Sequence, residues 1–248
     1  MQATSFDVRS PDFGARAARY DELRPADEAW WELFDVLVRE GELRGRRVLE
    51  IGCGTGQLAA ALAERAAARV WAVDAEPAMV ELARTRLRTA KLAHAECLPF
   101  RDGSFDRVVL RLVVHLLDRP RALPELRRVL TSGGRAVIAT FDPSHFDGFW
   151  LARLFPALEA IDRARFPELT ALEGELRAAG FASTRVVRLS QRNELSREQA
   201  LERIRGRHIS TFDLLDEKEL REGTERAERE LPDRVEVRLE WALVLARA

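Results

Sequence analysis

Residues 47–62 read RVLEIGCGTGQLAAAL, and they contain the pattern from which we predict the fold. Val48, Leu49 and Ile51 form a short apolar run, which is typical of a strand that is buried on both faces of a parallel sheet. Three glycines in five residues follow, and an Ala- and Leu-rich helical segment begins at Gln57. A strand, a glycine-rich turn and a helix in this order begin a nucleotide-binding βαβ unit. The glycines permit a sharp turn, and the first N–H groups of the helix remain free to bind a ligand.

The spacing of the glycines and the acidic residue before them distinguish between ligands. Gly52, Gly54 and Gly56 form G-x-G-x-G, whereas dinucleotide-binding proteins have G-x-G-x-x-G. Glu50 stands two residues before the first glycine. This turn resembles motif I of the class I methyltransferases that depend on S-adenosylmethionine (SAM). The resemblance implies that these four residues bind SAM, whose sulfonium and ammonium groups suit an acidic neighbour. The spacing disfavours a nicotinamide oxidoreductase, and the remaining alternative is a turn that binds no ligand.

A second motif follows after one helix. Residues 69–73 predict a second strand, which ends at Asp74, twenty residues after the middle glycine. An acidic side chain at this place accepts hydrogen bonds from ribose hydroxyls. Residues 74–79, DAEPAM, resemble the D-x-S-x-x-M stretch of the same family. The resemblance places Asp74 and Ala75 at the cofactor and the soft side chain of Met79 against the adenine. The alternative for Asp74 is that it only caps a helix.

Residues 94–106, HAECLPFRDGSFD, form a long match to the same family. They resemble its D-A-x-x-L-P-F-x-D-x-S-F-D pattern, in which the first Asp contacts the adenine amino group and the next backbone N–H contacts the ring. The resemblance implies these contacts for His94 and Ala95, although His94 stands where the family has Asp. A neutral histidine is able to accept the amino proton, and Glu96 is the alternative acceptor. Residues 123–134, LPELRRVLTSGG, resemble the helix and turn that follow in this family.

Arg111 departs from the family, which has a small residue near this position. Residues 105–111 predict a fourth strand, and open α/β sheets bind their ligands at the carboxyl ends of such strands. We therefore expect Arg111 at the cofactor, where it pairs with Glu50 or with a carboxylate of the ligand or acceptor. His115 follows at the same edge, where the family has one or two histidines. It is a candidate base, and the alternative is that it caps or packs.

The flanking segments predict a helical cap over the carboxyl end of the sheet. Residues 18–25, ARYDELRP, resemble an N-terminal segment of small-molecule methyltransferases in which an aromatic residue lies over SAM. This implies a cofactor contact for Tyr20, and the alternative is that Tyr20 packs a helix onto the domain. Residues 146–158 predict an aromatic-rich helix. The resemblance implies that this insert covers the acceptor pocket, and the alternative is that the helix packs on the core. Residues 196–231 predict further helices, which begin at a capping box.

The remaining segments complete the sheet and its covering. Two helices are expected to pack on it, at residues 121–130 and 168–179. We expect short strands at residues 91–95, 136–141 and 186–189, and a long last strand at 235–246 that is antiparallel in this family.

The composition excludes several classes of protein. The 248 residues suffice for one α/β domain with a good core. The net charge of −1 provides no basic field for nucleic acid, which disfavours RNA methylation. We recognise no target-recognition domain in the sequence, and this disfavours RNA or protein methylation. Cys53 and Cys97 are the only cysteines, and we expect them to be reduced. No apolar segment reaches 18 residues and no leader is evident, so we expect a cytoplasmic protein without membrane contact.

The resemblance, together with the pattern of elements, predicts an α/β fold. We expect a Rossmann-like, doubly wound, seven-stranded, mostly parallel sheet with an antiparallel last strand and a helical cap. Residues 1–248 form one methyltransferase domain in this interpretation. We place the core at about 41–143, 168–195 and 232–248, and the cap at about 1–40, 144–167 and 196–231.

The predicted function is methyl transfer from SAM to a small, partly apolar acceptor by in-line displacement under the cap. A base is required only if the acceptor must lose a proton, and the candidates are His115, His145 and His208. We expect a monomer or homodimer and no metal ion. The alternative is a SAM-binding sensor or pseudoenzyme that transfers no methyl group.

Overall fold

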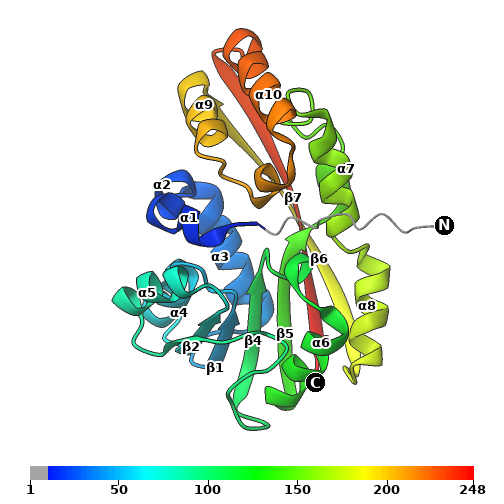
Figure 1. Cartoon of the computed structure of the whole chain (residues 1–248). Coiled ribbons are helices and arrows are strands. Elements are labelled where there is room, and N and C mark those ends of the chain that lie inside the picture. Colours follow the sequence, from blue (N-terminus) through cyan, green and yellow to red (C-terminus); the bar gives the residue numbers. More distant parts are fainter. Residues whose placement is uncertain (1–10) are drawn as a thin grey trace, which may run out of the picture.

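The apolar runs of the sequence form one sheet in the computed structural model, which describes residues 11–248 (Figure 1). Its strand order is β3-β2-β1-β4-β5-β7-β6. The strands from β3 to β5 are parallel, and β7 runs antiparallel to both β5 and β6. This arrangement of the described strands confirms the predicted seven-stranded sheet. The strands are β1 (Arg47–Ile51), β2 (Arg69–Asp74), β3 (Ala90–Leu92), β4 (Phe105–Arg111), β5 (Leu130–Phe141), β6 (Ser183–Ser196) and β7 (Arg234–Arg247).

Helices cover both faces of the sheet. They are α3 (Glu28–Gly41), α4 (Gln57–Arg65), α5 (Pro77–Arg86), α6 (Arg119–Val129) and α8 (Leu169–Ala178). Successive side chains of a strand point to opposite faces. Val48 and Val109 therefore pack with α3, α4 and α5 on one face. Leu49 and Val108 pack with α6 and α8 on the other.

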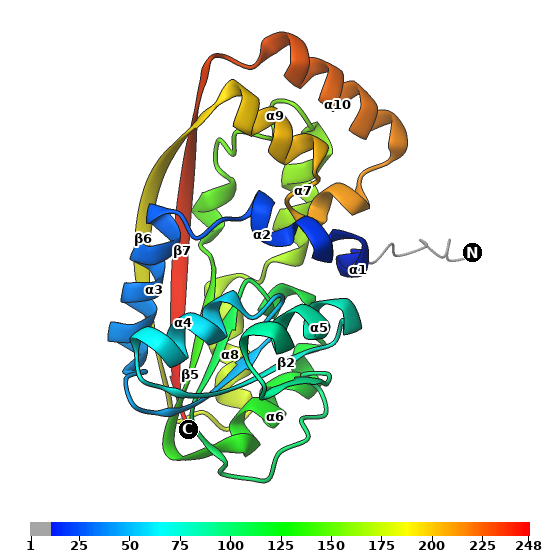
Figure 2. The same cartoon turned by 90° about the vertical axis from the view of Figure 1, so that its left-hand side faces the viewer.

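The N-terminal helices divide between the sheet and the region above it. The sequence places residues 1–40 in the cap, of which residues 1–10 lie outside the described part. The apolar stripe of α3 is buried against β5, β6 and β7, so this helix extends the sheet core. A stripe of this width requires a large apolar surface, which the sheet provides. Three short segments lie between the sheet and the cap (Figure 2), namely α1 (Phe13–Arg16), η1 (Ala17–Arg19) and α2 (Tyr20–Leu23).

β6 and β7 are longer than the sequence predicts, and they leave the sheet together. They pair over their whole length, from Ser183 with Arg247 to Ser196 with Arg234. β5 pairs only with residues 241–247 of β7. The other halves of β6 and β7 therefore form a two-stranded ribbon that continues beyond the sheet (Figure 2). The predicted sixth strand is too short because the outer half of β6 is polar and contains no apolar run.

The outer half of the ribbon packs with several helices to form a cap above the sheet (Figure 1), and the cap has its own hydrophobic cluster. The cap contains α7 (Pro156–Arg165), α9 (Arg197–Arg205), η4 (Ser210–Leu214) and α10 (Glu217–Glu230). Phe155, Phe212 and Val237 are buried in this cluster. The predicted capping box of Ser196 and Gln199 is present at the start of α9. Within residues 11–248, no helix is long and apolar enough to cross a membrane.

The predicted aromatic-rich helix at residues 146–158 is wrong. The segment begins with the end of the short 3-10 helix η3 (Pro143–Phe146) and continues through turns, and α7 begins only at Pro156. Proline has no backbone N–H and fixes φ, so it fits the first turn of a helix better than its interior. Phe146, Phe149 and Phe155 are nevertheless buried.

Two strand boundaries also differ from the prediction. β3 covers Ala90–Leu92 and not 91–95, because the chain turns at His94, whose carbonyl oxygen accepts a hydrogen bond from the N–H of Cys97 at 3.1 Å. β5 begins at Leu130, earlier than predicted. Its pairing with β4 is irregular near this end, where Gly133 has a φ of 73°. Glycine adopts this conformation without strain, so the strand continues through the sequence that predicts a turn.

Candidate active site

The motif I turn joins β1 to α4, and its three glycines serve different purposes. Gly52, Gly54 and Gly56 have φ angles of 68°, 54° and 81°, in the left-handed region that favours glycine. A Cβ atom on Gly52 would lie 2.3 Å from Val113, and one on Gly56 would lie 3.1 Å from the Cα of Ala83. A Cβ atom on Gly54 would meet only one aromatic carbon, at 3.9 Å. The outer glycines therefore permit close packing, whereas Gly54 keeps its side open.

Gly54 opens onto a cavity of about 290 Å³ at the carboxyl ends of β1, β2 and β4, which we call the first cavity. Ten of the twelve predicted cofactor residues line it, namely Tyr20, Gly52, Gly54, Asp74, Ala75, Met79, His94, Ala95, Glu96 and Arg111. Gly56 packs against α5, and Glu50 is buried. Sequence reasoning missed Phe13, Glu76, Leu112, Val113, Leu116 and others of the lining. Most of these are apolar residues of no distinctive spacing, so no sequence signal marks them.

Asp74 ends β2 and ties it to the glycine turn. One carboxylate oxygen accepts a hydrogen bond from the N–H of Gly54 at 2.7 Å, and the other accepts from the N–H of Glu76 at 2.9 Å. Burial raises the pKa of Asp74, and these hydrogen bonds oppose the rise. Each oxygen keeps a further lone pair, so the carboxylate is able to accept hydrogen bonds from a ligand. The residue that caps α5 is Glu76, which accepts from the N–H of Ala78 at 3.3 Å.

Glu50 is buried in β1, and one of its oxygens has no partner. Its Oε2 makes no hydrogen bond with any residue of the described part. Burial raises the pKa of Glu50 to about 8, although the positive charge of Arg111 opposes the rise. No ion pair joins Glu50 to Arg111 within residues 11–248. A nearby cation would favour the charged form of such an acid, so Glu50 fits a cationic ligand group.

The opposite edge of the first cavity is formed by the stretch after β3. Met79 is 1% exposed and packs beneath this edge. Glu96 accepts a hydrogen bond from the N–H of Asp118 at 3.0 Å, at the start of α6. This contact engages one Glu96 oxygen within the fold. The ring of His94 makes no hydrogen bond in the described part of the chain, which leaves its ring nitrogens free for a ligand.

The N-terminal segment is held against motif I by Asp21, which sequence reasoning missed. The hydroxyl of Thr55 donates a hydrogen bond to Asp21 at 2.6 Å. Arg86 of α5 forms an ion pair with the same carboxylate at 2.6 Å and donates to the carbonyl oxygen of Thr55 at 2.8 Å. These contacts place the neighbouring Tyr20 at the first cavity. The sequence does not reveal this contact, because Asp21 and Thr55 are 34 residues apart and no local pattern relates them.

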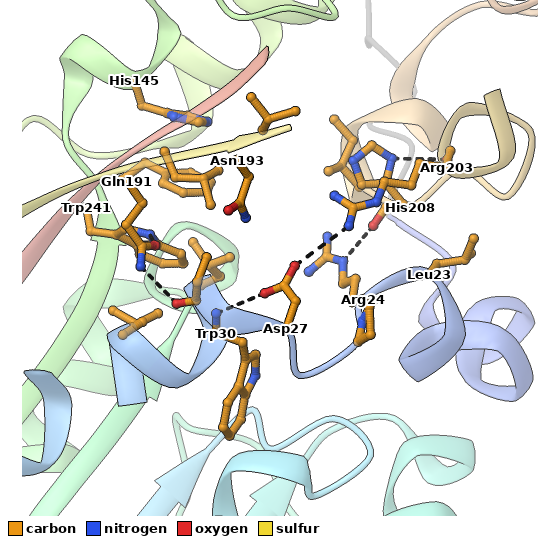
Figure 3. Close-up of a pocket in the computed structure, with 18 of the residues that line it drawn as sticks. Leu23, Arg24, Asp27, Trp30, His145, Gln191, Asn193, Arg203, His208 and Trp241 are labelled. Carbon is orange, nitrogen blue, oxygen red and sulfur yellow. Dashed lines mark hydrogen bonds and ion pairs between the residues drawn. The ribbon is translucent and has the colours of Figure 1, made fainter. Parts of the chain in front are cut away.

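A second cavity of about 150 Å³ lies between the sheet and the cap (Figure 3). Arg111 and Leu112 line both cavities, so the two adjoin. Five aromatic residues contribute to the second cavity, namely Trp30, Phe141, Phe149, Trp150 and Trp241. Its polar lining consists of Arg24, Asp27, Arg111, His145, Gln191, Asn193, Arg203 and His208. The lining comes from α2, α3, β4, β5, the ribbon and α9, and from the segments that follow α2, β4, β5 and α9.

The three candidate histidines are uncharged at neutral pH. Burial lowers the pKa of His145 to about 4 and those of His115 and His208 to about 3. His145 stacks on Phe141, and its Nδ1 accepts from the N–H of Glu240 at 3.4 Å. His208 lies 3.0 Å from the carbonyl oxygen of Arg203 through Nδ1, which must therefore donate.

His115 lies apart from the first two cavities. It lines a smaller cavity of about 60 Å³ and stacks on Phe166 with ring centres 3.9 Å apart. His145 lines this small cavity as well as the second one. The structure therefore brings His145 and His208 together at the second cavity and leaves His115 at its margin. Within residues 11–248, no group of acidic, His and Cys side chains is arranged to hold a metal ion.

The comparison with known proteins agrees with this geometry. The methyltransferase domain family matches residues 49–138, from the motif I strand to β5. The demethylmenaquinone methyltransferase of Thermus thermophilus is 34% identical over 203 residues, which are 68% of this chain and 91% of that protein. The chain belongs to the class I SAM-dependent methyltransferases. SAM is the cofactor of this family.

Two further proteins are similar to this methyltransferase. The ubiquinone/menaquinone biosynthesis C-methyltransferase UbiE of Bordetella avium is 37% identical over 142 residues, which are 52% of this chain and 55% of that protein. The chain spans about half the length of most of the curated relatives it matches. A solved structure from Anabaena variabilis, described as a methyltransferase from an antibiotic biosynthesis pathway, has a TM-score of 0.70 at 22% identity. It covers 87% of this chain and 96% of its own, and it shows that the fold is shared.

Proposed function

We propose that this chain transfers the methyl group of SAM to a small, partly apolar acceptor. The observation that carries the proposal is the junction of the two cavities at Arg111 and Leu112. One cavity lies at the motif I turn, and the other is lined by aromatic side chains under the cap. A cofactor in the first and an acceptor in the second would be neighbours, and such proximity is the main contribution an enzyme makes to a preactivated methyl group.

We assign SAM to the first cavity, with Asp74 at its ribose hydroxyls and Met79 and His94 at its adenine. The open side of Gly54 would admit the methionine part, and Glu50 would supply a negative charge near its cations. When bound, SAM would supply a methyl group on its sulfonium sulfur, and in-line displacement would transfer that methyl group to the acceptor. The residues of the chain bind and orient the reactants, and the cap keeps water from them. Core and cap thus act as one methyltransferase domain.

The histidines suit a supporting role better than that of a strong base. A pKa near 3 or 4 makes each a weak proton acceptor. Nδ1 of His145 is occupied as an acceptor, so Nε2 carries the proton and cannot take another. Nδ1 of His208 donates to a carbonyl, which leaves Nε2 with its lone pair. We propose His208 as the group that accepts a proton if the acceptor releases one.

We also propose that the protein works in the cytoplasm as a monomer or homodimer. Cys53 and Cys97 are free thiols, which supports a reducing compartment. Sedimentation of the purified protein would measure the oligomeric state, and a larger assembly would contradict the proposal.

Two measurements on the purified protein test the proposed function. Calorimetry should detect binding of SAM and of its demethylated product S-adenosylhomocysteine, but not of NAD. Incubation with methyl-labelled SAM and a panel of small carboxylates, phenols, amines and quinones should then transfer label to one class, which mass spectrometry would identify. Binding of SAM without transfer to any member of a broad panel would favour a sensor. Failure to bind SAM would overturn the proposal.

A further inference from the structure

The second cavity contains more positive than negative charge. Arg24, Arg111 and Arg203, which we call the arginine cluster, line it together with a single acidic residue, Asp27. The charge of Arg24 lowers the pKa of both Arg111 and Arg203, after the larger effect of burial on each. The guanidinium group of Arg24 is therefore close enough to each of the other two to repel it. One carboxylate among three cations leaves a positive excess.

The arginine cluster is poorly neutralised by the protein itself. Arg203 lies 3.9 Å from Asp27, at the outer limit of an ion pair (Figure 3). Arg24 donates to the carbonyl oxygen of His208 at 2.7 Å and to the hydroxyl of Tyr20 at 3.1 Å, but it pairs with no carboxylate of the described chain. The side chain of Arg111 makes no hydrogen bond or ion pair with residues 11–248, and its Nε is fully buried. Its guanidinium instead lies over the ring of Trp30, 5.6 Å from the ring centre.

Further hydrogen-bonding groups at this cavity are also unused. The indole N–H of Trp30 is buried without an acceptor in the described part. The side-chain amide of Asn193 makes no hydrogen bond with residues 11–248. Figure 3 shows this side chain between Gln191 and Arg203. Buried donors that lack acceptors are costly, and a buried cation is more so. Unused donors and excess positive charge would both be satisfied by an anion.

A carboxylate matches these features because its two oxygens accept hydrogen bonds from the planar fork of a guanidinium. We propose that the second cavity binds an acceptor that carries a carboxylate on an apolar or aromatic body, with the carboxylate at the arginine cluster and the body among the tryptophan and phenylalanine side chains. This inference rests on the proposed function and adds the chemical class of the acceptor. Arg24 and Arg203 line the second cavity and not the first.

The test measures binding to the protein saturated with S-adenosylhomocysteine, so that the first cavity is filled. The probes are 3-phenylpropanoate, indole-3-acetate and octanoate, each compared with its neutral amide by calorimetry and tryptophan fluorescence. At least one carboxylate should bind about tenfold more tightly than its amide. Arg203→Gln should reduce this preference to about threefold or less, whereas Arg203→Lys should retain part of it.

Arg153→Gln is the matched control, because Arg153 is exposed in the cap and lines neither cavity. It should leave the preference unchanged. Absence of any carboxylate preference in the native protein, or its persistence in Arg203→Gln and Arg111→Gln, would overturn the inference. If the native protein binds no S-adenosylhomocysteine, it is the proposed function that fails.

Discussion

At the scale of single residues, charge divides the site into two parts. Asp74, Glu76 and Glu96 line the first cavity, whereas Arg24 and Arg203 line the second and not the first. Opposite charge attracts, so this division favours a cationic cofactor on one side and an anionic acceptor on the other. Arg111 lies at the boundary, because it lines both cavities.

Asp74→Ala should weaken SAM binding by at least about tenfold, because a hydrogen bond to a charged group contributes about 1.5–3 kcal/mol. Calorimetry would measure the affinity. The substitution also removes the acceptor for the N–H of Gly54, so the melting temperature without ligand should fall modestly. Asp74→Asn keeps one oxygen and should lose less affinity. Asp233→Ala, at an exposed position in the cap, is the control. Unchanged affinity in Asp74→Ala would remove this residue from the site.

Glu50→Gln should stabilise the ligand-free protein at alkaline pH. Burial raises the pKa of Glu50 from 4.5 to about 8, so the folded state binds more protons than the unfolded state between these pH values. The contribution of Glu50 to the free energy of unfolding therefore falls as the pH rises through this window. Glutamine carries no charge, so the variant should be more stable than the native protein above about pH 8, by about 2 kcal/mol or more.

Melting temperatures of the Glu50→Gln variant, measured from acid to alkaline pH, check this prediction. The difference from the native protein should be small near pH 4.5 and should grow toward pH 8. Glu64→Gln removes a charge from an exposed position of α4 and should show no such trend. A pH-independent difference would contradict the assigned burial effect. The same variant should bind SAM more weakly, since it lacks the negative charge near the ligand cations.

At the scale of elements, the motif I turn is the point at which sheet, helix and ligand meet. Its outer glycines pack against Val113 and Ala83, and the middle one, Gly54, opens onto the first cavity.

Gly54→Val should abolish SAM binding by filling the space beside the middle glycine of the turn. Gly103→Val provides the matched control, because Gly103 has a similar φ of 65° and a Cβ atom there would meet no other atom within 4 Å. Both variants carry backbone strain, but only the first should lose SAM binding in calorimetry. Normal binding by Gly54→Val would contradict the assignment of motif I.

At the scale of the whole molecule, the cap is attached to the sheet through the ribbon of β6 and β7 and has its own core. The second cavity lies between the cap and the sheet, so an approach of the two would narrow it. The cap has its own hydrophobic cluster, which suits movement of the cap as a unit.

Bound SAM should slow amide hydrogen exchange in residues 13–23, 144–167 and 196–231 more than in β1, β4 and β5, which are already protected. Hydrogen-exchange mass spectrometry with and without SAM would measure this. α8 is the internal control, since it packs on the sheet, lines neither cavity and should change little. Protection confined to the glycine turn and Asp74 would show that the cap does not close on the cofactor. A macromolecular acceptor on an open surface would then become the better hypothesis.

Local chemistry explains why several strand bounds, the glycine turn and one helix start could be predicted from the sequence. The bounds of β1, β2 and β4, the glycine turn and the start of α5 at Pro77 all follow from apolar runs and from residues with restricted or permissive backbones. Such features depend on neighbours within a few positions, so spacing reveals them. The same motifs identified ten residues that line the first cavity.

The tertiary structure alone decided where distant segments meet. α3 joined the sheet core, and the polar outer half of β6 became a strand only because β7 pairs with it. Arg24, Arg111 and Arg203 converge from the end of α2, from β4 and from α9, and no spacing in the sequence relates them. Backbone pairing and burial between segments far apart in the chain are set by the whole packed molecule. The second cavity, unlike the first, is therefore visible only in the folded structure.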